Sequence, residues 1–262
     1  MLHGFYLFKR VRSQKILLKG VLIRMHIPDG YLSPVTALPI AAVMVPIIGI
    51  AVKKVQTTMK KKQAPLLAIG AAFSFLIMMF NLPIPGGSSA HAVGAVLIAI
   101  LLGPWAATVA VTVALIIQAM IFGDGGIITL GANCFNIAFL MSFGGYYSYR
   151  LIKAKADASS IRGLVAAACG GYIGINLAAL STAVMFGMQY HWFQGPDGTP
   201  LYFMYPLKVA LTVMMGEHLL FAGPVESAFT VLGVLFVART YPEMIGSSAI
   251  KTGKTKGVMA NV

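Results

Sequence analysis

Charged residues and cysteines are scarce in this sequence. Charged residues make up 10% of the 262 residues, whereas 58% are hydrophobic. The mean hydropathy of +0.83 lies outside the range of soluble globular domains and indicates a polytopic membrane protein. The two cysteines, Cys134 and Cys169, lie in apolar stretches without a C-x-x-C partner. This arrangement favours a packing role over a disulfide or a zinc site.

Several enzyme motifs are also missing from the sequence. There is no G-x-x-x-x-G-K-[ST] loop, so the chain cannot hydrolyse ATP by that route. There is no H-E-x-x-H, and Gly87-Ser88-Ser89-Ala90 does not complete a G-x-S-x-G nucleophile turn. An intramembrane metal-dependent hydrolase that uses the His and Glu residues is therefore only an alternative. Activity on a peptide or lipid that is lost in Glu217→Ala would support it.

Basic residues are the one abundant charged class, with 20 Lys and Arg against 7 Asp and Glu and a formal net charge of +13. They lie in loops between apolar runs, which is typical of topology-setting charge and not of a nucleic-acid-binding face. A membrane-spanning helix needs about 20 apolar residues to cross about 30 Å of hydrocarbon. Seven segments fit this pattern, at 33–52, 65–82, 89–103, 105–122, 132–149, 163–188 and 207–237.

The third apolar segment, 89–103, is shorter than the others. It is separated from the fourth only by Gly103-Pro104, where we expect a helix to break. The preceding residues, 81–91, are rich in Pro, Gly and Ser, which is typical of irregular backbone buried in a membrane protein. We therefore predict an all-α fold of seven transmembrane helices with a re-entrant segment.

The positions of the basic residues predict the orientation. The residues that follow the first, fifth and seventh segments are rich in Lys and Arg, whereas the loops at 83–90, 123–131 and 189–206 have none. By the positive-inside bias, the C-terminus is cytoplasmic and the start of the first segment lies outside. We expect a multi-pass protein of the cytoplasmic (inner) cell membrane, with a domain at 25–238 and a basic cytoplasmic tail at 239–262.

Residues 1–24 carry six basic residues but no signal-peptide core and no small-x-small cleavage site. We expect translation to begin at Met25. Proteolytic removal of 1–24 is the second possibility, and a retained basic extension is the third.

Met25 and His26 form a candidate metal chelate if Met25 is the N-terminus. Its free amine, the amide nitrogen of His26 and the His26 imidazole can then close on one ion through fused five- and six-membered rings. Such nitrogen donors suit Ni(II), Cu(II) or Co(II) better than Mg or Ca. The alternative is an ordinary turn that leads into a helix and whose backbone is determined by Pro28 and Asp29-Gly30.

His91 is the candidate fourth ligand. It follows a Gly- and Ser-rich turn and opens the short third segment, and an ionisable side chain near a membrane helix is a functional candidate. It could equally be a histidine that is hydrogen-bonded at the membrane interface.

The chain resembles the CbiM/NikM family, the substrate-binding membrane components of energy-coupling-factor (ECF) cobalt and nickel importers. The resemblance covers 25–238. One departure is Ala90-His91-Ala92-Val93, where many relatives have Gly before the His and Leu after it. The matching stretches are 25–34, Gly87–Gly94, Leu102–Ala107, Gln118, Gly123–Gly126, Leu130–Asn136, Gly216–Leu220 and Gly223–Glu226.

The resemblance implies a function and a site. In this family the Met-His pair enters the core and the later His completes the metal site, which implies Met25, His26 and His91 as ligands of transported Co(II) or Ni(II). It implies no cofactor, and it implies as partners a coupling transmembrane subunit, ATPases and a small accessory membrane protein. Cobalt imported in this way would supply cobalamin biosynthesis. A permease that needs no ATPase is an alternative.

Several other polar residues are candidates to support the metal site. A metal-bound His normally donates its second ring N–H to another group. The candidates for that role are Ser88, Ser89, Gln118 and Asn133, which could instead bond only backbone. Glu226 is interpreted as an interhelical or partner contact, and Glu217-His218 as a group near the outer third of the last segment.

Overall fold

The computed structural model describes residues 26–59, 64–84 and 88–241, and for 82–84 and 88–90 the backbone alone. Met25, which is predicted to be the N-terminus, and the segments 1–24 and 242–262 lie outside the described residues. The elements are α2 (Pro34–Thr58), α3 (Ala64–Met79), β1 (Leu82–Ile84), β2 (Ser88–Ala90), α4 (Ala95–Leu102), α5 (Pro104–Ile117), η2 (Gln118–Phe122), α6 (Leu130–Asn133), η3 (Cys134–Leu140), α7 (Met141–Lys153), α8 (Ile161–Trp192), α9 (Leu207–Glu217), η4 (His218–Ala222) and α10 (Gly223–Thr240).

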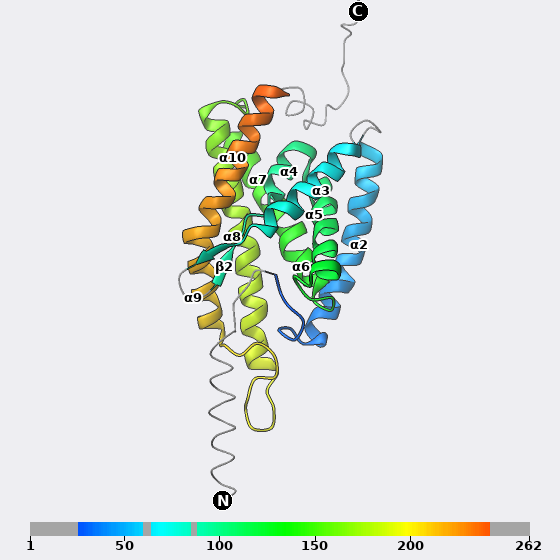
Figure 1. Ribbon diagram of the computed structural model, residues 1–262, viewed down its shortest axis with the longest axis vertical. Helices are drawn as coiled ribbons and strands as arrows, with labels where there is room; N and C mark the ends of the chain where they lie inside the picture. Colours follow the sequence, from blue (N-terminus) through cyan, green and yellow to red (C-terminus); the bar gives the residue numbers. More distant parts are fainter. Residues whose placement is uncertain (1–25, 60–63, 85–87, 242–262) are drawn as a thin grey trace, which may run out of the picture.

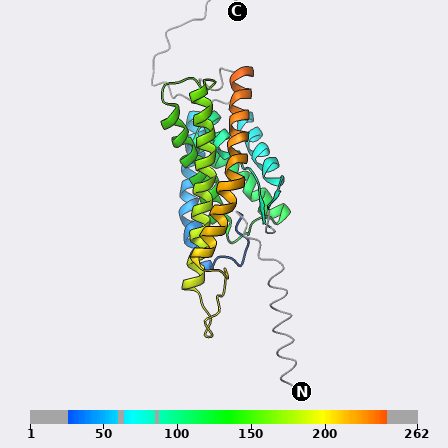
Figure 2. The same ribbon diagram turned by 90° about the vertical axis from the view of Figure 1, so that its left-hand side faces the viewer.

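The long helices run side by side in an elongated bundle (Figures 1 and 2). The 32-residue α8 packs against α7, α9 and α10, and α5 packs against α2, α3 and α4. Among the described residues, four helical runs are long and apolar enough to cross a membrane: Pro34–Thr58, Pro104–Phe122, Ile161–Trp192 and Leu207–Thr240. Large apolar side chains on their outer faces are exposed, as lipid-facing residues would be.

The helical expectation is confirmed, and helical runs lie at all seven predicted apolar segments. The number of crossings and the orientation stay predictions. One difference is local: residues 88–90 do not belong to the third helix but pair as β2 with β1 in an antiparallel two-stranded hairpin. The predicted break is confirmed, because α4 ends at Leu102 and α5 begins at Pro104, with Gly103 at a φ of +92° between them.

The helix α4 has only eight residues. At 1.5 Å per residue it rises about 12 Å, which is less than half of the hydrocarbon core. Its residues 95–100 are all buried. Residues 91–94, which connect β2 to α4, are buried as well. Buried irregular backbone followed by a short helix resembles the predicted re-entrant segment.

In the part of the chain that the structure describes, the helices are interrupted by three π-helical segments, η2, η3 and η4. Such segments are rare and often occur at functional sites because they change the direction of side chains and free backbone groups. Gln118 and His218 begin two of them, and Asn133 immediately precedes the third. All three of these side chains are buried.

Candidate metal centre

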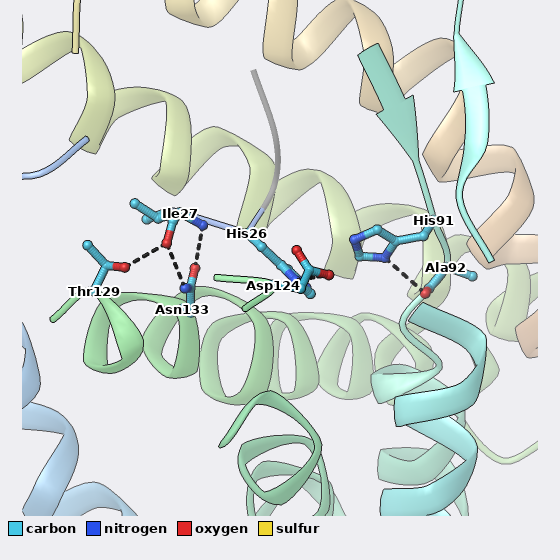
Figure 3. A network of polar contacts seen from close by, with 7 residues as sticks. All are labelled: His26, Ile27, His91, Ala92, Asp124, Thr129 and Asn133. Carbon is cyan, nitrogen blue, oxygen red and sulfur yellow. Dashed lines mark hydrogen bonds and ion pairs between the residues drawn. The ribbon is translucent and has the colours of Figure 1, made fainter. Parts of the chain in front are cut away.

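His26 and His91 meet in the interior of the bundle. Their ring centroids are 4.8 Å apart, with the rings at 65° to one another. Both residues are buried, with exposed fractions of 2% and 8%. His26 lies on the extended stretch that leads to α2, and His91 lies between β2 and α4 (Figure 3). The fold thus brings together two imidazoles that are 65 residues apart in the sequence.

Hydrogen bonds to the backbone of Ile27 fix the residue next to His26. The Ile27 N–H donates to Asn133 Oδ1 at 2.8 Å, and Asn133 Nδ2 donates to the Ile27 carbonyl at 3.1 Å. The same carbonyl accepts from Thr129 Oγ1 at 2.6 Å and from the Gly126 N–H at 2.9 Å. Because Ile27 is buried, its N–H would lose the acceptor that it has in the structure if Asn133 were removed, whereas its carbonyl would keep two donors.

Asp29, three residues after His26, binds the loop 123–129. Its carboxylate accepts hydrogen bonds from the N–H groups of Ile127 (2.9 Å), Ile128 (2.9 Å) and Thr129 (3.3 Å). Gly126 packs so closely that a Cβ there would overlap the side chain and the amide nitrogen of Asp29. The loop 123–129 is thereby bound to the stretch that carries His26.

A second set of contacts anchors the stretch farther along. The Ser33 N–H donates to Gln189 Oε1 at 2.9 Å, which links the start of α2 to α8. The Tyr31 ring lies against Phe186 and Phe203, with centroids 5.6 and 5.8 Å away. His26, Ile27, Leu32 and Ser33 are buried, whereas Asp29 and Gly30 at the turn between them are exposed. The stretch 26–33 is therefore anchored in the protein at both of its ends.

The His91 ring is oriented by its neighbour. Its Nδ1 lies 3.2 Å from the Ala92 carbonyl oxygen. Because a carbonyl can only accept, this contact requires the proton on Nδ1 and leaves the lone pair of Nε2 available as a ligand.

Glu226 fixes the backbone that follows His91. Its fully buried carboxylate accepts from the Val93 N–H at 2.7 Å and from the Gly94 N–H at 3.1 Å. Ser74 Oγ donates to the Val93 carbonyl at 2.9 Å. Glu226 therefore makes an interhelical contact from α10 to the start of α4, which is one of the two interpretations given to it.

Asp124 is an acidic residue of the site that the sequence interpretation did not single out. Its Oδ2 lies 3.2 Å from Nδ1 of His26, without hydrogen-bond geometry. The Asp124 side chain is 27% exposed, whereas that of His26 is 2% exposed. In the view of Figure 3 the carboxylate overlaps the edge-on ring of His26 and lies on the side of that ring toward His91. The signal in the sequence was a lone acidic residue in a Gly-rich turn between two apolar segments.

The other predicted residues lie in different surroundings. Asn133 uses both ends of its amide on Ile27. Gln118 is fully buried, and neither of its polar side-chain atoms has a hydrogen-bond partner within the described residues. Ser88 and Ser89 lie on β2, and their side chains are outside the described part.

His218 lies close to this region. It is buried, and its Nδ1 lies 2.8 Å from the Met214 carbonyl oxygen. The π-helical segment η4, which it begins, contacts β2.

Side chains alone do not form a metal cage in the described residues, where no group of three or more His, Cys, Asp or Glu could hold an ion. What they provide is a pair of facing imidazoles next to one carboxylate. Tight binding of a divalent ion here would require further donors.

The chain is similar to known metal transporters. It is 47% identical over 221 residues to the fused nickel transport protein NikMN of Rhodobacter capsulatus, covering 84% of this chain and 64% of that protein. Thus the chain spans less than two thirds of that relative's length. A crystal structure of a transition metal transporter matches with a TM-score of 0.78 and 49% identity, covering 87% of this chain and all of that one.

A second crystal structure, of a truncated transition metal transporter, matches with a TM-score of 0.77 and 52% identity over 82% of this chain and 98% of that one. The family model for CbiM, described as the cobalt uptake substrate-specific transmembrane region, matches residues 26–244. The chain therefore belongs to the CbiM family.

Proposed function

We propose that this protein is the substrate-capture component of an ATP-driven cobalt or nickel importer. The observation that carries the proposal is the pair of buried, facing imidazoles of His26 and His91, held from two distant segments. Imidazole nitrogens suit a borderline-soft divalent ion. The ion is the transported substrate.

The ligand set follows from ring sizes. With Met25 as the N-terminus, a five-membered ring joins its amine to the His26 amide nitrogen. A six-membered ring then joins that nitrogen to Nδ1 of His26, because Nε2 is too far along the imidazole. His91 Nε2 supplies the fourth nitrogen. Four nitrogen donors with a planar preference favour Ni(II), and they also accept Co(II).

Gln118 is proposed as a supporting residue of this site. Its buried amide has both polar atoms without partners in the described residues, and such atoms are costly unless another group completes them. Asn133 supports the site indirectly, by holding the backbone next to His26.

The partners proposed are a coupling transmembrane subunit and ATPase subunits of the ECF type. The sequence has no nucleotide-binding loop of the G-x-x-x-x-G-K-[ST] form, so the proposal assigns ATP hydrolysis to the partner subunits. The family description as a substrate-specific region of cobalt uptake, and a relative named as a fused nickel transport protein, support this division of labour. Imported cobalt would serve cobalamin biosynthesis.

The test is metal binding by purified variants. We expect His26→Ala and His91→Ala each to weaken Ni(II) and Co(II) binding by about 100-fold or more, because each removes a ligand of a chelate. The matched control is His191→Ala, since His191 is an exposed histidine at the end of α8. Stoichiometric tight binding in both ligand variants would contradict the site.

Uptake distinguishes the proposed importer from a permease. The chain is co-expressed with its proposed partner subunits, and uptake of radioactive nickel is measured before and after ATP depletion. Uptake that requires the partners and stops on depletion supports the importer. Uptake by this chain alone that is insensitive to ATP depletion would contradict the importer and support the permease.

A further inference from the structure

We propose that Asp124 is a capture ligand, whose carboxylate first binds the incoming Ni(II) or Co(II) ion and passes it to Nδ1 of His26. The inference rests on the proposed function, because it concerns the path into the same site. It adds a residue that is not among the four nitrogen donors and assigns it a kinetic role.

The first observation is the gradient of exposure across the contact. The Asp124 side chain is 27% exposed, and its partner across 3.2 Å, His26, is 2% exposed. The carboxylate therefore touches both solvent and the buried nitrogen. An ion that arrives from water meets Asp124 before it meets either imidazole.

The second observation is the distance itself. Two neighbouring ligands at right angles on one ion, each with a bond of about 2.1 Å, have donor atoms about 3.0 Å apart. The separation of Asp124 Oδ2 and His26 Nδ1 is 3.2 Å. One ion can therefore be bound by both atoms at once, which is the geometry that a transfer from oxygen to nitrogen requires. By ring size, Nδ1 is also the nitrogen that the chelate uses.

The third observation is that the loop holds Asp124 in this place. The Asp124 N–H donates to the Gln118 carbonyl at 3.0 Å. Gly123 and Gly125 on either side adopt φ values of +66° and +87°, which favour glycine. The Asp29 carboxylate binds the N–H groups of the following residues. The carboxylate is thus presented by an ordered turn.

The fourth observation is a comparison of Asp124 with three other acidic residues. The carboxylates of Asp29 and Glu226 accept backbone hydrogen bonds that hold the fold together. Asp197 bonds Thr199 within its own loop. Among these, only Asp124 lies against a proposed metal ligand.

The chemistry fits this role. A hydrated divalent ion exchanges water readily for a carboxylate oxygen, and a negative group at the mouth of a site raises the local concentration of cations. The nitrogen chelate then binds more strongly, because nickel and cobalt prefer nitrogen to oxygen donors more than Mg or Ca do. In a protein with a formal net charge of +13, a local anion matters for attracting a cation.

The test separates capture from affinity. Association and dissociation rates of Ni(II) are measured by stopped-flow mixing with purified wild type, Asp124→Asn, Asp124→Glu and Asp197→Asn. Asp197→Asn is the matched control, since it makes the same charge change at an exposed outer loop. We expect Asp124→Asn to slow association about tenfold or more, a range typical of electrostatic steering, with dissociation nearly unchanged. Asp124→Glu keeps the carboxylate and should associate faster than Asp124→Asn.

Three results would overturn the inference. Unchanged association in Asp124→Asn removes the capture role, and faster dissociation alone assigns Asp124 to positioning of His26. Equal association rates in Asp124→Asn and Asp124→Glu show that the carboxylate is not used. If Asp124→Asn does not yield folded protein, Asp124→Ser takes its place in the comparison. Failure of the wild type to bind nickel would instead refute the proposed function.

Discussion

Asn133→Ala is the sharpest test of how the protein holds the stretch that carries His26. The substitution removes two buried hydrogen bonds, to the N–H and the carbonyl of Ile27. The carbonyl keeps its bonds from Thr129 and Gly126, but the Ile27 N–H loses the acceptor that it has in the structure. With about 1 kcal/mol for each of the two lost bonds and about 1 to 2 kcal/mol more for the unsatisfied N–H, the bound position of the stretch is destabilised by about 3 to 4 kcal/mol.

This cost appears in metal affinity if the chelate forms only when the stretch is bound in the core. At about 1.4 kcal/mol for each factor of ten, the dissociation constant for Ni(II) should rise by about 100-fold to several hundred-fold. The assay is competition with a chelator of known affinity, on protein that elutes as a single species.

The matched control is Asn136→Ala, one helical turn away. Asn136 is also buried, but its amide bonds Thr182 and not the stretch 26–33. We expect it to lower thermal stability while the nickel affinity stays within about threefold of wild type, because no contact of the stretch is lost. Equal affinities for Asn133→Ala and wild type would refute the reasoning, and so would equal losses in the two variants.

Two further substitutions probe the surroundings of the site. Gly126→Ala places a Cβ on Asp29, whereas in the control Gly49→Ala no atom lies within 4 Å of the added Cβ. We therefore expect lower nickel affinity and a lower melting temperature for Gly126→Ala than for Gly49→Ala. Equal nickel affinities in the two variants would contradict the close packing of Gly126 on Asp29. Glu226→Ala leaves the buried N–H groups of Val93 and Gly94 without their acceptor, at about 1 to 3 kcal/mol each, whereas Glu226→Gln keeps one oxygen. Melting temperatures should fall in the order wild type, Gln, Ala, and a Glu226→Ala variant as stable as wild type would show that these bonds contribute nothing.

Much of the fold could be predicted because apolar runs of membrane length specify helices with few alternatives. The break at Gly103-Pro104 followed from proline geometry alone. The hairpin at β1 and β2 could not be predicted in the same way, since residues 89 and 90 were placed at the start of the apolar segment 89–103. They form a strand because they pair with Leu82–Ile84, and that pairing depends on a turn whose geometry hydropathy does not report.

The partner of a close helix contact is also hard to predict from the sequence. Gly170 and Gly174 have a spacing that permits close approach, but the sequence does not say to what. In the structure, a Cβ at Gly170 would meet the Gly145 carbonyl at 2.9 Å, and one at Gly174 would meet that of Met141 at the same distance. Both glycines pack against α7 of this chain.

The candidate site could be predicted only in part. His26 and His91 stood out because ionisable residues are rare in apolar segments. Asn133 was singled out for bonding a histidine ring, with backbone as the alternative, and the structure shows it bonded to the backbone of Ile27. The contact of Asp124 with His26 depends on how the loop 123–129 folds over the stretch 26–29. Such long-range loop packing leaves no periodic signal in a sequence.

The most direct test of the account is a native mass spectrum of the protein, purified without an N-terminal tag from its own membranes after growth with nickel and cobalt. The account predicts a chain that begins at Met25 and carries one Ni or Co ion, because the chelate needs the free amine of that residue. A chain that begins at Met1 and still carries the ion would contradict it. The amine of Met25 would then be part of an amide, and the ligands would have to be sought around His26, His91 and Asp124.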